Sequence, residues 1–74
     1  MNWVLNLPMV SDELSDIAEK VEWYNKLIKD YYKSNNVGKA INLEYIRDML
    51  IDDIYQRVRM FWTEDEIERA QRVE

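Results

Sequence analysis

Residues 11–33, SDELSDIAEKVEWYNKLIKDYYK, decide the fold of this chain. Their apolar side chains alternate spacings of three and four residues, which places them on one face of an α-helix. The members of this stripe are Leu14, Ile17, Val21, Tyr24, Ile28 and Tyr31. Ser11 is a favourable N-cap residue, and residues 34–36 (SNN), followed by the only glycine, Gly38, mark the end. We therefore predict a helix over residues 11–33.

A second helix is predicted over residues 42–61, with Asn42 as its N-cap and Ile41 and Ile46 as a hydrophobic staple. Its main apolar stripe consists of Leu43, Ile46, Leu50, Ile54, Val58 and Phe61. Further apolar residues fall on another side, namely Tyr45, Met49 and Met60. The helix is therefore apolar over a wide arc, which indicates either a central position or a second face that contacts another molecule.

A third, short helix is predicted over residues 63–73. Thr63 is a good N-cap, and Glu66 stands where its capping-box partner is expected. A break or kink is expected near Trp62, which would form a staple with Ile67. The alternative is one unbroken helix over residues 43–73, because no residue there forbids it sterically.

Residues 1–10 allow two interpretations. Trp3, Leu5, Leu7 and Met9 alternate with Asn2, Val4, Asn6 and Pro8, which is the period of a β-strand. A lone strand has to pair with another strand, so the alternative is an extended arm that lies across the helices and is fixed by Trp3. The fold class predicted from all segments is all-α: a small bundle or hairpin of two long antiparallel helices, with a short C-terminal helix and an extended N-terminal arm.

The chain has 74 residues, which we expect to form a single domain, residues 1–74. Domains of this size often use a disulfide, a metal or a partner subunit to supplement a thin core. The sequence has no Cys and no His, so disulfides are impossible and the usual ligands of structural zinc are missing. We predict neither a metal nor a cofactor. Aromatic packing or formation of a homodimer would then supplement the core.

The charge and hydropathy patterns disfavour two classes of partner. A net charge of −5 disfavours nonspecific binding to nucleic-acid phosphates. No apolar run approaches the roughly 20 residues that would span a bilayer, and Met1–Val10 lacks the basic start and the long apolar stretch of a signal peptide. We therefore expect a cytoplasmic protein that does not bind membranes, and we regard nucleic acid as a disfavoured partner.

Catalysis finds little support in the residue types present. Without His or Cys, a nucleophile and its base would have to come from Ser, Lys, Tyr or carboxylates, and a single glycine cannot build a Gly-rich phosphate loop. Glu44, Asp48 and Asp52 form an i, i+4, i+8 row. Such a row can hold a hard cation or imitate a nucleic-acid backbone, but it is more commonly a solvated helix face. We expect no enzymatic activity and treat these three residues as a candidate acidic face.

The candidate partner-binding residues are Trp23, Tyr45, Met49 and Met60. Trp23 lies off the main stripe of its helix among charged residues, where contact with a partner and packing at the edge of the core are equally good interpretations. Trp and Tyr are enriched at interface hot spots, and adaptable Met side chains suit contact surfaces. The aromatics on or beside the apolar stripes are expected in the core, namely Tyr24, Tyr31, Tyr55 and Phe61.

Residues 3–8, WVLNLP, which lead into Leu14, Ile17 and Ala18, resemble the opening of a ribbon–helix–helix repressor. In that family, strands from two chains pair, and their outward side chains enter the major groove of DNA. The resemblance implies this role for Asn2, Val4 and Asn6. Residues 54–58, IYQRV, also resemble part of the second helix of the family. The strand segment lacks Lys and Arg, and the following helical stripe continues past the point where the family has a tight turn. The resemblance implies a dimeric DNA-binding repressor, which we keep as the alternative function behind protein binding because of these two departures.

We conclude that the sequence favours a non-catalytic protein-binding module: a small acidic adaptor, modulator or inhibitor of a larger macromolecule. Small, acidic, single-domain chains of this type resemble the accessory proteins of phages and mobile elements, which often inhibit a host enzyme. This resemblance is one of type and implies a protein partner without identifying it.

Overall fold

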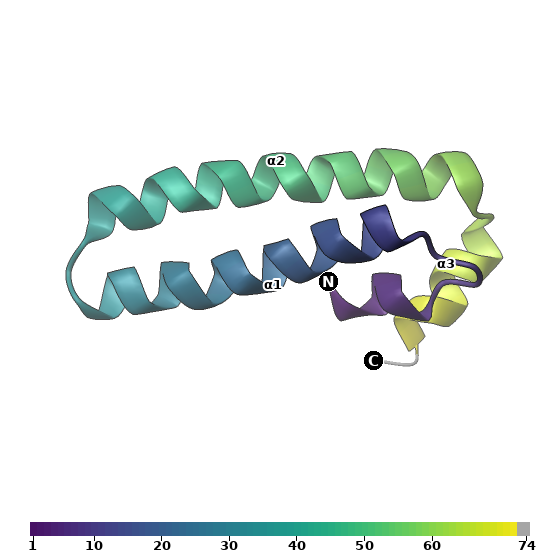
Figure 1. Ribbon diagram of the computed structural model, residues 1–74, viewed down its shortest axis with the longest axis horizontal. Coiled ribbons are helices and arrows are strands. Elements are labelled where there is room, and N and C mark those ends of the chain that lie inside the picture. Colours follow the sequence, from purple (N-terminus) through teal and green to yellow (C-terminus); the bar gives the residue numbers. More distant parts are fainter. Residues whose placement is uncertain (73–74) are drawn as a thin grey trace.

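The computed structural model describes residues 1–72 as a short 3₁₀ helix, η1 (Asn2–Asn6), and three α-helices, α1 (Asp12–Lys33), α2 (Val37–Phe61) and α3 (Glu64–Arg72). Helices α1 and α2 form a long antiparallel hairpin, and η1 and α3 lie together at the end away from the hairpin turn (Figure 1). The molecule measures 41 × 21 × 19 Å. The prediction of an all-α hairpin with a short C-terminal helix is confirmed.

Helix α1 begins and ends where its sequence signals predicted. The Ser11 side chain accepts a hydrogen bond from the backbone N–H of Leu14 at 3.2 Å, which caps the first turn. At the other end, Asn35 takes the left-handed conformation, with φ of 61°. The N–H groups of Asn35 and Asn36 donate to the carbonyls of Tyr32 and Tyr31. This is the Schellman arrangement, which satisfies the last carbonyls of a helix and reverses the chain within three residues.

Helix α2 begins at Val37, five residues before the predicted start at Asn42. The Schellman turn reverses the chain so tightly that the next residue can already be helical. The first turn is then held by the burial of Ala40, which has no exposed surface. Gly38 consequently lies inside α2 and not in the turn.

The predicted break between the last two helices is confirmed. Trp62 is extended, with φ of −127° and ψ of 150°, which excludes one continuous helix. Thr63 and Glu66 form the predicted capping box: the Glu66 carboxylate accepts from the Thr63 N–H at 3.0 Å, and the Thr63 hydroxyl accepts from the Glu66 N–H at 3.2 Å. Trp62 also donates from Nε1 to the carbonyl of Pro8 at 2.8 Å, so the break is tied to the N-terminal segment.

Residues 2–6 are neither a strand nor an extended arm. They form η1, in which Trp3 and Val4 are buried and Leu5 is 42% exposed, and Leu7, the residue that follows η1, is buried too. Burial therefore follows the period of a helix and not the alternation of a strand, so the strand predicted from the alternating apolar residues is wrong. The described residues contain no strand that could pair as the ribbon–helix–helix resemblance implied, and Val4 lies in the core.

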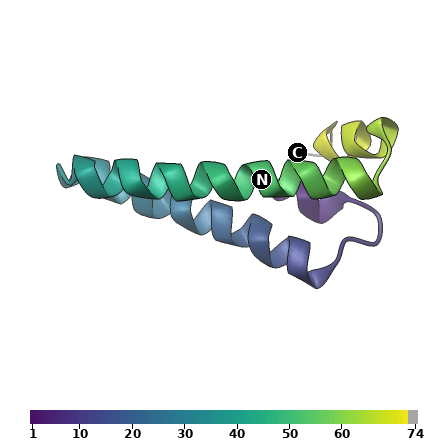
Figure 2. The same cartoon turned by 90° about the horizontal axis from the view of Figure 1, so that it is seen from above.

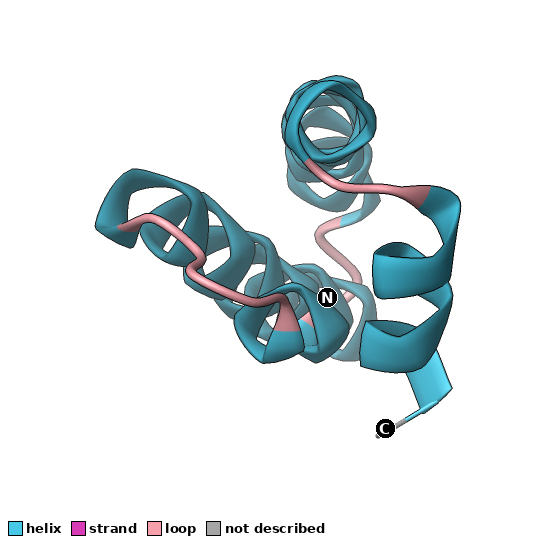
Figure 3. Ribbon diagram, turned by 90° about the vertical axis from the view of Figure 1, so that its right-hand side faces the viewer, coloured by secondary structure: helices cyan, strands magenta, loops and turns pink. Residues whose placement is uncertain are grey.

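The main core lies at the end of the hairpin that carries η1. The axes of α1 and α2 splay apart toward this end (Figure 2), and the buried side chains of η1 share one core with those of both helices. Helix α3 packs mainly on η1 (Figure 3). The buried members of this core are Trp3, Val4, Leu7, Leu14, Ala18, Val21, Ile54, Val58 and Ala70. Beyond it, toward the hairpin turn, α1 and α2 pack only on each other, and Ile28 and Ala40 are buried.

Two members of the predicted apolar stripe of α2 are exposed. Phe61 is 71% exposed, because α2 ends there and the chain turns so that Trp62 packs against the core instead. Ile46 is 42% exposed, because α2 is covered there by α1 alone. The other three aromatics expected in the core, Tyr24, Tyr31 and Tyr55, are half-buried.

The burial of η1 predicts different costs for two leucines of the same segment. Leu7→Ala removes a side chain that is 3% exposed and should lower the free energy of unfolding by about 2–5 kcal/mol. Leu5→Ala, the matched control, removes an exposed side chain and should change it by only about 0.5 kcal/mol. Urea denaturation followed by circular dichroism measures both, and equal effects of the two substitutions would contradict the burial of η1.

The turn between α1 and α2 predicts opposite signs for two substitutions to alanine. A Cβ atom at Gly38 would meet nothing within 4 Å, so Gly38→Ala should stabilise the protein by about 0.5–1 kcal/mol. Asn35→Ala should destabilise it by about 1 kcal/mol, because alanine tolerates the left-handed conformation poorly. Thermal unfolding of the two variants checks this, and a shift of both melting temperatures in one direction would count against the described turn.

Candidate protein-binding surface

The face of α2 that points away from α1 carries exposed apolar side chains toward the hairpin turn. Four of them follow one another at i, i+4 spacing: Val37, Ile41, Tyr45 and Met49. Their side chains are 47%, 54%, 69% and 58% exposed, in that order. We call these four residues the outer row. One step of four residues rises about 6 Å along a helix, so neighbouring members lie next to each other on the surface. Ile46, also exposed, widens the surface beside Met49.

The acidic row, Glu44, Asp48 and Asp52, runs beside the outer row. Each carboxylate already has a hydrogen-bond donor: the Tyr32 hydroxyl donates to Glu44 at 2.6 Å, Arg47 to Asp48 at 3.1 Å, and Gln56 to Asp52 at 3.0 Å. The three carboxylates therefore do not converge on a common point. Within residues 1–72, no group of three His, Cys, Asp or Glu side chains is placed to hold a metal ion. The acidic row is a solvated edge of the apolar surface.

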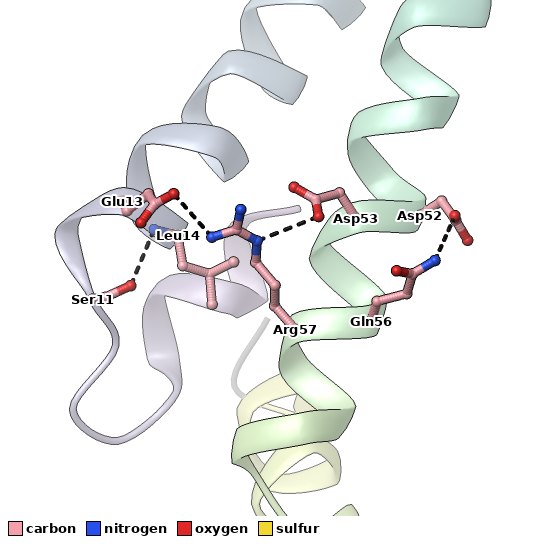
Figure 4. Close-up of polar contacts among 7 residues, drawn as sticks. All are labelled: Ser11, Glu13, Leu14, Asp52, Asp53, Gln56 and Arg57. Carbon is pink, nitrogen blue, oxygen red and sulfur yellow. Dashed lines mark hydrogen bonds and ion pairs between the residues drawn. The ribbon is translucent and has the colours of Figure 1, made fainter.

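Three polar contacts between α1 and α2 fix the position of the outer row relative to the core. Near the hairpin turn, Tyr32 donates to Glu44. In the middle, Arg47 donates to the side-chain oxygen of Asn25 at 3.1 Å. Near the start of α1, Arg57 donates to Glu13 at 3.0 Å (Figure 4). Contacts at three points along the hairpin hold one register, which keeps the outer row facing away from α1.

The four predicted binding residues are all exposed, but the structure does not bring them together. Tyr45 and Met49 are neighbours in the outer row. Met60, 75% exposed, lies eleven residues further along α2, beyond the polar Asp52 and Gln56. Trp23, 57% exposed, lies on α1, where its ring contacts that of Tyr24 with 5.4 Å between centroids. Sequence reasoning missed Val37 as a surface residue and assigned Ile41 and Ile46 to a staple, because it placed the start of the helix too late.

A hollow lies where residues 8–11 pass the end of α2. Its volume is about 630 Å³, and its walls include the exposed side chains of Met9 and Phe61 together with Arg57. Arg57 contacts two carboxylates, Glu13 at 3.0 Å and Asp53 at 3.3 Å, as Figure 4 shows. The hydrogen bonds that Arg57 donates to Glu13 and Asp53 raise the pKa of its guanidinium above its already high ordinary value. Its charge is compensated within the chain, so this hollow has no free cation to attract an anionic ligand.

Comparisons with known proteins found no match for this chain among family models, curated proteins or solved structures. None of the helices in residues 1–72 has both the length and the apolar character that crossing a membrane requires.

The contact between Tyr32 and Glu44 predicts a titration that can be measured. The hydrogen bond, together with desolvation and the negative charge of Glu44, raises the pKa of the Tyr32 hydroxyl above its ordinary value of about 10. The bond therefore supports the fold below pH 10 or so, and its contribution is lost as the pH rises through the raised pKa. Glu44→Ala should lower the pKa of Tyr32 toward the ordinary value, as followed by NMR of the ring. Asp52→Ala, in the same row, serves as the control and should leave it unchanged.

Proposed function

We propose that this protein is a non-catalytic protein-binding module whose contact surface is the outer row of α2. The observation that carries the proposal is the unbroken i, i+4 series of exposed apolar side chains, Val37, Ile41, Tyr45 and Met49. Single exposed apolar residues are ordinary on protein surfaces, but contiguous apolar patches mark interaction sites.

The outer row has the form of a helix that docks in a groove. Helices of this kind present anchors at i, i+4 and i+8 to an apolar groove on the partner. Ile41, Tyr45 and Met49 supply such anchors, and Tyr45, at 69% exposed, has the largest surface to bury. The tyrosine ring offers a large contact area with a polar tip, and Met adapts to irregular surfaces. The acidic row beside the anchors favours a groove with basic residues along one edge.

The composition agrees with binding as the role. Chemistry on a substrate would need reactive groups held together, and the chain has neither His nor Cys. An adaptor, a modulator or an inhibitor of a larger macromolecule needs only a stable helix with an exposed face. The core around η1 provides the stability, and the hairpin carries the face away from it.

The test compares three versions of the protein as bait in extracts of its source cells. Tyr45→Ser with Met49→Ser alters the outer row, and Met60→Ser with Phe61→Ser is the matched control, because it removes equally exposed apolar side chains elsewhere on α2. Circular dichroism should show all three to be equally helical. We expect a protein that is recovered by the wild type and by the control but is lost with the Tyr45 and Met49 variant.

The recovered protein is then purified, and its affinities for the wild type and for the two variants are measured by calorimetry. Loss of two anchors should weaken binding by about 30-fold or more, at roughly 1–2 kcal/mol for each side chain. Hydrogen exchange should slow in residues 41–49 on binding. Equal affinities of the wild type and of the double variant, Tyr45→Ser with Met49→Ser, would contradict the proposal.

A further inference from the structure

Helix α1 carries an ordered line of charges on the face away from α2. Asp12, Glu19, Lys26 and Lys33 follow at intervals of seven residues, and all four are exposed. Seven residues are almost two turns, so the four side chains form one line along the helix. The line carries two negative charges in its first half and two positive charges in its second. We call it the heptad line.

The helix itself does not account for this order. Acidic residues at the start of a helix and basic residues at its end compensate the helix dipole, but that effect is confined to the first and last turns. Glu19 and Lys26 lie in the middle of α1, well beyond those turns. Among residues 1–72, none of the ion pairs involves a member of the heptad line. Within the described residues, none of the four charges thus forms an ion pair with a charge of opposite sign.

We propose that the heptad line binds a second copy of this chain, with the two α1 helices antiparallel. A two-fold axis at the middle of the line, between residues 22 and 23, places Asp12 opposite Lys33 of the second copy and Glu19 opposite Lys26. By symmetry each pair occurs twice, so the whole line is matched with opposite charges. A parallel arrangement would instead place like charges together. A left-handed crossing of about 20° keeps such a seven-residue line in contact along both helices.

Trp23 supplies the apolar centre of this interface. It is 57% exposed on the same face of α1 and lies next to the proposed two-fold axis. The Trp23 rings of the two copies therefore meet near the axis, where tryptophan is most effective as an interface anchor. Glu22 does not interfere, because it already pairs with the amino group of Met1.

The dimer goes beyond the proposed function and does not depend on it, because it uses α1 and not α2. The outer faces of α1 and α2 point in opposite directions, so a dimer through α1 leaves both copies of the outer row exposed. The assembly would then present two identical binding surfaces facing away from each other.

The test uses charge reversal, with self-association measured by sedimentation velocity over a concentration series. Glu19→Lys and Lys26→Glu each convert two attractive contacts of the dimer into repulsive ones, so each alone should raise the dissociation constant about ten-fold or more. The double variant Glu19→Lys with Lys26→Glu restores opposite charges in every pair and should dimerise like the wild type. Trp23→Ala should weaken the dimer while circular dichroism stays unchanged.

Mixing the two single variants gives the sharpest result. The Glu19→Lys chain is basic at both positions of the central pair, and the Lys26→Glu chain is acidic at both. Every pair of a heterodimer is then of opposite charge, so a heterodimer should form from two chains that associate poorly alone. Net charge cannot produce this outcome, because a change of two units leaves both chains negative. Asp65→Lys and Arg69→Glu on α3 are the controls, since they change the net charge equally and should leave the dimer intact.

Salt should weaken the wild-type dimer, because the Debye length falls from about 8 Å at 0.15 M to about 3 Å at 1 M ionic strength. A wild-type chain that is monomeric at every concentration at low salt would overturn the proposal. So would a dimer that Glu19→Lys leaves intact, or a mixture of the single variants that stays monomeric.

Discussion

The burial of Trp3, Val4 and Leu7 among the three α-helices is the constraint on which the rest of the structure depends. Helices α1 and α2 splay apart at this end, and the side chains of η1 join theirs in one core. Helix α3 has few contacts with the hairpin and is held mainly by η1. Two hydrogen bonds, from Trp62 to Pro8 and from Asn6 to Ala70, strengthen this attachment. A segment of seven residues thus takes the place of the disulfide or metal that many small domains use.

The location of this core explains why binding surfaces lie elsewhere. The half of the hairpin near its turn consists of only two elements, α1 and α2. Each helix there can bury one face against the other, and the opposite face meets solvent. Val37, Ile41 and Tyr45 on α2 are exposed for this reason. The topology explains why these positions are exposed. It does not explain why they carry large apolar side chains, and this is what points to a binding surface.

The sequence predicted those features that rest on short-range chemistry. The cap at Ser11, the capping box at Thr63 and the turn at residues 34–36 each depend on a few neighbouring residues, and each is found where predicted. The form of residues 2–6 was not predictable in this way, because a 3₁₀ helix gains its stability here from the groove it fills. The exposure of Phe61 and Ile46 likewise depends on how far α1 covers α2. For the candidate site, helical phase identified Tyr45 and Met49, whereas the late start assigned to α2 concealed Val37 and Ile41 as part of the same row.

The hydrogen bond between Asn6 and Ala70 joins residues that are 64 positions apart in the chain. The hairpin turn, by contrast, is closed by contacts over a few residues. Contacts of short sequence separation form early, and those of long separation require most of the chain. During synthesis α1 and α2 can therefore pair as soon as both have left the ribosome, while Trp3, Val4 and Leu7 lack their full cover until α3 emerges. For that interval the apolar side chains of η1 are exposed, and such surface is open to aggregation or to a chaperone.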